Sequence, residues 1–219
     1  MTRMVLFDLD GTLVDTAQDL GRTLNEMRRR RGLAALPDEV LRPQASHGTR
    51  GLLKAGFGLG PEHPDFESLR REFLTLYALN LTVSSTPFPG MTEVLDALER
   101  RAIAWGVVTN KPARYSEPLL DHLGLRSRAA CIVSGDTCPE PKPHPGPLMH
   151  ACRTAGADPG DCLYVGDAQR DVQAATAAGM PSIVALYGYL SAEDRPREWG
   201  ASGFIERPAD LLDYLVSGS

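Results

Sequence analysis

Six short apolar segments recur along the chain, and from residue 91 onward they alternate with helical patterns. Runs that are apolar at nearly every position are typical of strands buried on both faces of a parallel sheet. The alternation therefore predicts an α/β fold in which helices cover both faces of a parallel sheet. Pro118 is expected to kink or restart the helix that contains it. The expected strands are 4–8, 103–109, 130–134, 162–166, 182–186 and 203–206, and the expected helices are 91–101, 113–123, 145–155, 170–178 and 208–216.

The segment from residue 16 to residue 83 breaks this alternation, because it holds helical periodicity and no convincing strand. Its clearest helix is 64–79, whose apolar side chains recur mainly at i, i+3 and i+7. The Pro- and Gly-rich stretch 86–90 has the composition of a return linker. The sequence predicts two units joined by hinges near 14–16 and 84–89. These units are an α/β core of residues 1–15 and 84–219 and an all-helical cap of residues 16–83.

The first apolar segment ends in two carboxylates, Asp8 and Asp10, which bracket a single leucine. Alternate residues of a strand point to one side, so both carboxylates would face the same region if strand geometry continued. Two like charges held close together need a cation or a shared proton. The following Gly11 and Thr12 allow a sharp turn that presents backbone N–H groups to an anion. A strand followed by an Asp-rich turn is the alternative interpretation of this segment.

Polar residues also follow two other expected strands, and ligands of parallel α/β sheets bind at the carboxyl ends of strands. Thr109 and Asn110 follow one strand, Asp167 follows another, and Asp171 comes four residues later. Lys142 stands between two prolines. Taken singly, Thr109 fits a strand-end cap, Asp171 a helix N-terminal acid and Lys142 an exposed loop lysine. Together with the first pair, these groups give four carboxylates against one lysine, a charge near −3, which predicts a bound divalent cation.

Composition excludes several classes of protein. The 219 residues carry a net charge of −5, whereas nucleic-acid-binding domains usually present a basic face. The run Arg28–Arg31 before Gly32 fits the cationic last turn of a helix and its glycine cap. No apolar stretch approaches the ~20 residues needed to span a bilayer, no signal-peptide pattern opens the chain, and the four cysteines lack zinc-site spacing. We expect a soluble cytoplasmic protein with no membrane partner; its oligomeric state is left open.

In this order along the chain, the strand-end motifs resemble those of the haloacid dehalogenase superfamily of phosphatases. The resemblance covers nearly all of the chain and includes a helical insert where the C1 subclass carries its cap. It implies a Rossmann-like core with an inserted cap. Residues 7–15 resemble the phosphoglycolate phosphatase group. Residues 105–112, 187–189 and 199–201 resemble bacterial N-acetylmuramic acid 6-phosphate phosphatases, which implies a place in peptidoglycan recycling.

The resemblance implies hydrolysis of a phosphomonoester through an aspartyl-phosphate intermediate with Mg²⁺ as cofactor. Asp8 would be the nucleophile, and Asp10 would protonate the leaving oxygen and later deprotonate the attacking water. Mg²⁺ prefers oxygen ligands, and those implied are Asp8, the main-chain carbonyl of Asp10, and Asp167. The phosphoryl oxygens would be neutralised by Thr109, the Asn110 backbone N–H and Lys142. Asp171 would not contact the substrate itself but would hold a water molecule or Lys142 in position.

Substrate choice is expected to lie in the cap, where the polar stretch 46–51 resembles the specificity loop of the family. Arg50 suits bidentate recognition of a substrate carboxylate. Gly48 is a further candidate contact, and His47 either contacts substrate or caps a helix. The expected partner is a small phosphomonoester that carries a carboxylate. We favour N-acetylmuramic acid 6-phosphate, with 2-phosphoglycolate as the alternative.

Proteins with other activities share some of these motifs. Response-regulator receivers share strand-end Asp, Thr and Lys residues, but the acid at Asp10 and the helical insert count against a receiver. Dehalogenases and phosphonate hydrolases lack the acid at the Asp10 position and are disfavoured. A sugar phosphomutase stays open, because the sequence offers no clean test against it.

Overall fold

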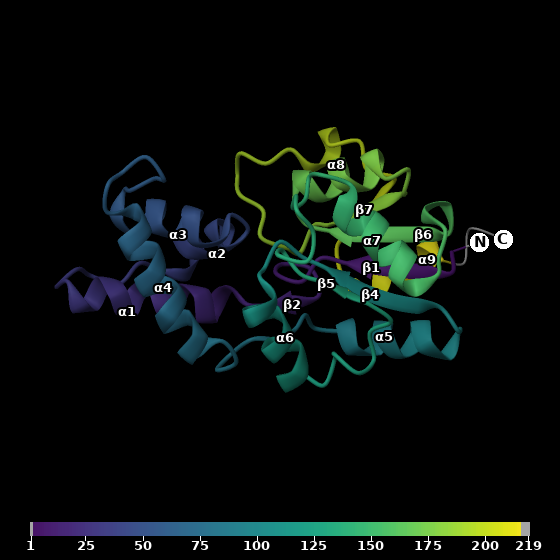
Figure 1. Ribbon diagram of the computed structural model, residues 1–219, viewed down its shortest axis with the longest axis horizontal. Helices are drawn as coiled ribbons and strands as arrows, with labels where there is room; N and C mark the ends of the chain where they lie inside the picture. The colour runs from purple at the N-terminus through teal and green to yellow at the C-terminus, as the bar shows by residue number, and fades with distance from the viewer. Residues whose placement is uncertain (1, 216–219) are drawn as a thin grey trace.

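The computed structural model describes residues 2–215, which form a six-stranded parallel sheet with a group of helices to one side (Figure 1). The strand order is β5-β4-β1-β6-β7-β8, and every neighbouring pair is parallel. This arrangement confirms the predicted α/β, Rossmann-like core. The strands are β1 (Met4–Phe7), β4 (Ala104–Val108), β5 (Ile132–Val133), β6 (Cys162–Gly166), β7 (Ser182–Ala185) and β8 (Gly203–Ile205).

Helices cover both faces of the sheet, and the alternation of side chains along β1 explains why. Val5 and Phe7 pack toward α5, α6 and α9, whereas Met4 and Leu6 pack toward α7 and α8. All four side chains are buried, which is the reason for the uninterrupted apolar run. The helices are α5 (Met91–Arg100), α6 (Ala113–His122), α7 (Gly146–Ala155), α8 (Gln169–Ala177) and α9 (Leu211–Tyr214), with 3₁₀ turns at Pro159–Asp161, Pro196–Glu198 and Pro208–Asp210.

Two expected helices differ from the observed ones. Helix α6 runs without interruption through Pro118, so of the two expected outcomes, a kink or a restart, the restart does not occur. Leu119 and Leu120 are fully buried, and their packing holds the helix together despite the missing N–H. The expected helix 208–216 is a 3₁₀ turn followed by the short α9, and its last residue lies outside the described part of the chain. Asp210 accepts the backbone N–H of Arg207 at 2.9 Å and so fixes the tight first turn.

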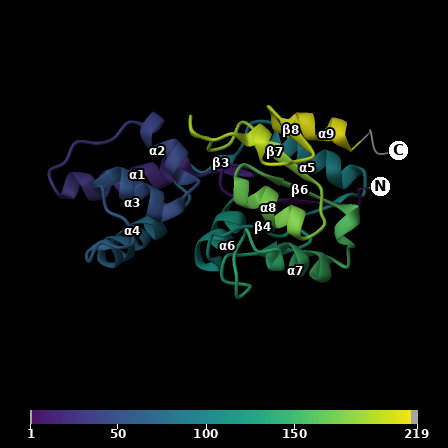
Figure 2. The same cartoon turned by 90° about the horizontal axis from the view of Figure 1, so that it is seen from above.

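The remaining helices lie together beyond one edge of the core, and two perpendicular views agree on this separation (Figures 1 and 2). Their buried faces meet in a common apolar cluster that includes Leu24, Leu52 and Phe73. As predicted, the arginine run ends a helix at Arg30, and Gly32 follows with φ of 68°. The helices are α1 (Ala17–Arg30), α2 (Asp38–Ala45), α3 (Gly48–Phe57) and α4 (Phe66–Asn80).

The two crossings between core and helical insert lie side by side. Strand β2 (Val14–Asp15) pairs antiparallel with β3 (Thr86–Pro87). Next to this ribbon, the buried carboxylate of Asp19 accepts hydrogen bonds from the backbone N–H groups of Ser84 at 3.0 Å and Ser85 at 2.8 Å. It also accepts the Ser85 hydroxyl at 2.7 Å. The proposed boundaries of the cap, residues 16 and 83, fall beside this ribbon.

Two further findings concern the described residues as a whole. None of their helices combines the length and the apolar character that crossing a bilayer requires. The four cysteines are free thiols, although Cys152 and Cys162 lie 3.7 Å apart between their sulfur atoms.

Candidate active site

Three buried polar residues, Asp8, Thr109 and Asp167, follow the adjacent strands β1, β4 and β6. The register places Phe7 beside Val107 on one side and Val165 on the other, so the three strands end at the same level. After β1 the chain builds β4 and β5 on one side of that strand and β6, β7 and β8 on the other. The strand order therefore changes direction next to β1. A change of this kind opens a crevice at the carboxyl ends of the strands, where α/β proteins bind ligands.

Lys142 joins two of the acids. Its Nζ lies 3.0 Å from Asp8 Oδ1 and 2.8 Å from Asp171 Oδ1, and it donates to the Tyr164 hydroxyl at 2.7 Å. The Lys142 side chain is 0% exposed, which excludes the interpretation as a surface loop lysine. Asp171 contacts Lys142 as the resemblance implied.

The loop that carries Lys142 is held by Asn110. The Asn110 Nδ2 atom donates to the Lys142 carbonyl, and the Lys142 N–H donates to Asn110 Oδ1, both at 2.9 Å. The peptide bond between Lys142 and Pro143 is cis. Through these two hydrogen bonds the Asn110 side chain holds the backbone of Lys142 in place. The sequence did not reveal this role, because only the backbone N–H of Asn110 was predicted to take part in the site.

The buried carboxylates differ in electrostatic environment. Burial raises the pKa of Asp8 above its ordinary value, against the lowering effect of the Lys142 charge and with a further rise from Asp171. Burial also acts to raise the pKa of Asp171, but Lys142 and Arg170 outweigh it and hold that pKa below its ordinary value. Burial raises the pKa of Asp167 to about 7, and the Asp8 and Asp171 charges add to the rise. Of the three buried carboxylates, Asp167 is thus the one whose negative charge is least offset by neighbouring positive charge.

The acids form a donor set that fits a divalent cation. One carboxylate oxygen from each of Asp8, Asp167 and Asp171 lies within 4.8 Å of the others. Asp171 is already paired with Lys142, whereas from residues 2–215 Asp167 accepts only the Tyr189 N–H at 2.8 Å and the Thr12 hydroxyl at 3.4 Å. An all-oxygen set with an uncompensated buried charge suits Mg²⁺, with Asp8 and Asp167 the better placed ligands.

Two glycines allow the chain to approach Asp167 closely. A Cβ atom on Gly11 would lie 2.2 Å from Asp167 Oδ2, and Gly11 has φ of 86°, which other residues rarely adopt. A Cβ atom on Gly188 would lie 2.3 Å from the Cβ of Asp167. The sharp turn predicted at Gly11 is present, and its reason is contact with this acid.

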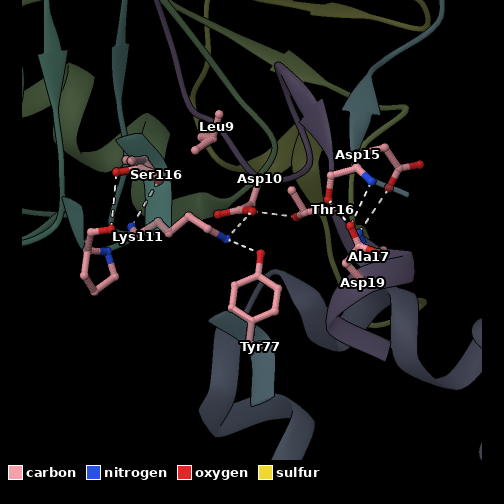
Figure 3. Close-up of polar contacts among 12 residues, drawn as sticks. Leu9, Asp10, Asp15, Thr16, Ala17, Asp19, Tyr77, Lys111 and Ser116 are labelled. Atoms are coloured by element: carbon pink, nitrogen blue, oxygen red, sulfur yellow. Dashed lines mark hydrogen bonds and ion pairs between the residues drawn. The ribbon is translucent and has the colours of Figure 1, made fainter. Parts of the chain in front are cut away.

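Asp10 is not one of the three clustered acids, and Figure 3 shows that it has hydrogen-bond partners of its own. Its Oδ1 accepts the Thr16 hydroxyl at 2.5 Å and the Lys111 ammonium at 2.9 Å. The same ammonium donates to the Tyr77 hydroxyl at 2.8 Å, from helix α4 of the insert. Because β1 ends at Phe7, strand geometry does not extend to Asp10, and the two carboxylates of the first motif have separate environments. Tyr77 is on the buried face of the helix expected at 64–79, but the apolar periodicity of that helix does not say what its hydroxyl contacts.

The expected charge near −3 needs correction, because two cations of the site were missed. Lys111 pairs with Asp10, and Arg170 of α8 carries its charge close enough to Asp8 to lower that pKa. Four carboxylates against Lys111, Lys142 and Arg170 leave a net charge of −1. The motifs identify strand-end residues, but they do not reveal which neighbouring side chains turn toward the site.

A cavity of about 730 Å³ adjoins these groups, between the core and the helical insert. Arg170 also reaches across it, donating to the Ser46 hydroxyl at 3.4 Å. His47 occupies the position before α3 but makes no capping hydrogen bond with its side chain. Lys142, Asp167 and Asp171 are buried beside the cavity rather than lining it. The predicted site residues that line it are Asp8, Asp10, Thr109, Asn110, His47, Gly48 and Arg50.

Comparison with known proteins decides the family. A sequence model of the haloacid dehalogenase-like hydrolases matches residues 5–185. The chain belongs to this family. Its similarity to individual members extends over almost its whole length, which confirms the resemblance seen in the motifs.

Two relatives and one solved structure illustrate this similarity. An N-acetylmuramic acid 6-phosphate phosphatase of Pseudomonas aeruginosa is 40% identical over 213 residues, covering 97% of this chain and 94% of the relative. A phosphoglycolate phosphatase of Xylella fastidiosa is 47% identical over 208 residues, covering 94% and 90%. A crystal structure described as a predicted phosphoglycolate phosphatase from Haemophilus somnus superposes with a TM-score of 0.85 at 28% identity, covering 98% of both chains. The prediction that the chain is a phosphatase-type hydrolase is confirmed.

Proposed function

We propose that the chain is a Mg²⁺-dependent phosphomonoester hydrolase whose substrate carries a carboxylate, with N-acetylmuramic acid 6-phosphate the favoured substrate. The observation that carries the proposal is a buried acidic cluster, Asp8, Asp167 and Asp171, beside a cavity lined by cations. The acids suit a metal-assisted attack on phosphorus, and the cations suit a substrate with more than one negative group.

The reaction divides between the two carboxylates of the first motif. The Asp8 carboxylate attacks phosphorus, the ester P–O bond breaks, and the leaving oxygen takes a proton from Asp10. Asp10 then takes a proton from the water that attacks the phosphoryl group on Asp8, which releases phosphate and restores both residues. The Thr109 hydroxyl, the Asn110 N–H and Lys142 would neutralise the phosphoryl oxygens.

Mg²⁺ would supply positive charge that offsets the repulsion of the attacking carboxylate by the phosphoryl group. Asp8, Asp167 and the main-chain carbonyl of Asp10 are the groups that would hold it. Asp171 holds Lys142 beside Asp8, with its Oδ1 atom 2.8 Å from the ammonium. The residues present therefore fit the cofactor.

Cavity size and charge favour the larger substrate. About 730 Å³ falls within the ~300–1,000 Å³ range of pockets that bind drug-sized ligands, and it exceeds what a two-carbon acid requires. A phosphate ester with a carboxylate has two anionic groups, and both need cationic partners. Besides Lys111, whose ammonium is already paired with Asp10, the cationic side chains that line the cavity are Arg50, Lys54, Arg70 and Arg170.

A substrate panel tests the proposal. We expect kcat/KM to be highest for N-acetylmuramic acid 6-phosphate and clearly lower for N-acetylglucosamine 6-phosphate, which lacks the 3-O-lactyl group and with it the carboxylate. Arg50→Ala should reduce the first value and leave the second nearly unchanged. A strong preference for 2-phosphoglycolate would reverse the assignment. Formation of an isomeric sugar phosphate in place of free phosphate would indicate a mutase.

A further inference from the structure

We propose that Lys111 and Tyr77 position the acid–base carboxylate Asp10, so that the helical cap contributes one member of the catalytic hydrogen-bond chain. The inference rests on the proposed function, in which Asp10 transfers protons to and from the reacting oxygens. Figure 3 shows the Lys111 ammonium between the two other side chains, joined by one dashed line to the Tyr77 hydroxyl and by another to the Asp10 carboxylate.

Lys111 is held at both ends. Its backbone N–H donates to the Thr109 hydroxyl oxygen at 3.1 Å, which fixes the start of the side chain beside a proposed phosphate-binding residue. Its Nζ lies 2.9 Å from Asp10 Oδ1 and 2.8 Å from the Tyr77 hydroxyl, and the side chain is only 7% exposed. Burial acts to lower the pKa of Lys111, but Asp10 and Tyr77 outweigh it, so the pKa lies above its ordinary value and the group stays an ammonium donor.

Tyr77 is a rigid support from α4. The centroid of its ring lies 6.1 Å from that of Phe73 and 5.7 Å from that of Tyr115. The Lys111 ammonium lies 4.7 Å from the centroid of the Tyr77 ring. Burial raises the pKa of Tyr77 to about 12, so a neutral hydroxyl accepts the lysine N–H. The lysine thus has a fixed contact from the cap in addition to its contacts within the core.

Within the described part of the chain, the side-chain hydrogen bonds to the Asp10 carboxylate fall on one oxygen. Thr16 and Lys111 both donate to Oδ1, and the Asp10 side chain is 19% exposed where it lines the cavity. Holding Oδ1 orients the carboxyl group and leaves Oδ2 to exchange the proton with substrate or water. Lys111 and Tyr77 therefore act on the reaction through Asp10 and need not touch the substrate.

A pair of esters separates this role from general damage to the site. Benzyl phosphate leaves as an alkoxide that must be protonated, whereas p-nitrophenyl phosphate leaves as a stabilised phenolate that need not be. The two are similar in size, and neither carries a carboxylate, so the comparison does not depend on the natural substrate. A positioning residue for Asp10 should affect kcat/KM for the benzyl ester far more.

The experiment measures kcat/KM for both esters in Mg²⁺-loaded wild-type protein and variants. Tyr77→Phe removes one hydroxyl and keeps the packed ring, and we expect about a fivefold fall for benzyl phosphate and less than about twofold for p-nitrophenyl phosphate. Lys111→Met should reduce the benzyl value about 100-fold, with a much smaller effect on the other ester. Tyr77→Phe should have no further effect in the Lys111→Met background, because it acts through the lysine.

The matched control is Tyr115→Phe, since the Tyr115 hydroxyl donates to the Leu74 carbonyl at 3.4 Å and not to Lys111. It should change both esters by the same factor. Equal slowing of both esters by Tyr77→Phe and Lys111→Met would overturn the inference, as would an undiminished Tyr77→Phe effect in the double variant. If wild-type protein hydrolyses neither ester nor any sugar phosphate, the proposed function fails, and the inference fails with it.

Discussion

Ionisation of Asp167 is expected to destabilise the metal-free protein. Its pKa rises from 3.8 to about 7 in the fold, so the folded chain holds this proton more tightly than the unfolded chain does. The stabilising contribution is fully present below pH 3.8 and is lost as the pH rises through about 7. A difference of about three pKa units corresponds to about 4 kcal/mol of unfolding free energy, lost at about 1.4 kcal/mol per pH unit.

Mg²⁺ should reverse this loss, because it binds the ionised carboxylate and competes with the proton. The apparent dissociation constant for Mg²⁺ should be about tenfold higher at pH 6 than at its limiting value and nearly constant above pH 8. The measurements are urea unfolding in EDTA between pH 5 and 8, and calorimetric titration with Mg²⁺ over the same range.

Asp167→Asn is the matched control, since the amide keeps the shape of the side chain and cannot ionise. The variant should lack this part of the pH dependence in EDTA and should bind Mg²⁺ weakly at every pH. The reasoning is refuted if wild type and variant lose stability with the same slope, or if Mg²⁺ affinity in the wild type is the same at pH 6 and pH 8.

Three other perturbations have defined outcomes. Lys142→Met leaves two buried aspartates without their cation and should cost about 3–5 kcal/mol in urea unfolding; a loss below about 1 kcal/mol would contradict the buried pairing. Pro87→Gly loosens the ribbon between core and cap and should change kcat and KM together several-fold. Pro89→Gly, outside the ribbon, is its control, and unchanged values for Pro87→Gly would count against a hinge there. Gly11→Ala should weaken Mg²⁺ binding at least about tenfold, because its methyl group collides with Asp167; wild-type affinity in a calorimetric titration would exclude that contact.

The sequence predicts the core and the strand-end residues because both follow from local patterns. Uninterrupted apolar runs predict the buried parallel strands, and the topology of such a sheet brings their carboxyl ends together. Asp8, Thr109 and Asp167 could therefore be grouped before any coordinates were known. Lys142 was grouped with them because two prolines fix its position in the chain, although nothing local indicates that such a lysine is buried.

The contacts between cap and core could not be predicted. Helical periodicity predicts that Tyr77 is buried, but it does not say which helix or loop covers it. These contacts depend on how the helical insert is oriented relative to the core. That orientation brings Tyr77 to Lys111 and brings Ser46 to Arg170. The charge of the site was misjudged for the same reason, because Lys111 and Arg170 belong to no motif that predicts the direction of a side chain.

The phosphoenzyme on Asp8 tests the central claim most directly. Protein is mixed with Mg²⁺ and p-nitrophenyl phosphate, whose leaving group needs no proton from Asp10, and is quenched in acid within milliseconds. The peptide that contains Asp8 is then analysed by mass spectrometry. The account predicts a phosphoryl group on Asp8 in the wild type, a larger fraction of it when Asp10→Asn slows the attack of water, and none in Asp8→Asn. Equal labelling of wild type and Asp8→Asn, or release of phosphate with no labelled peptide at any time, would contradict it.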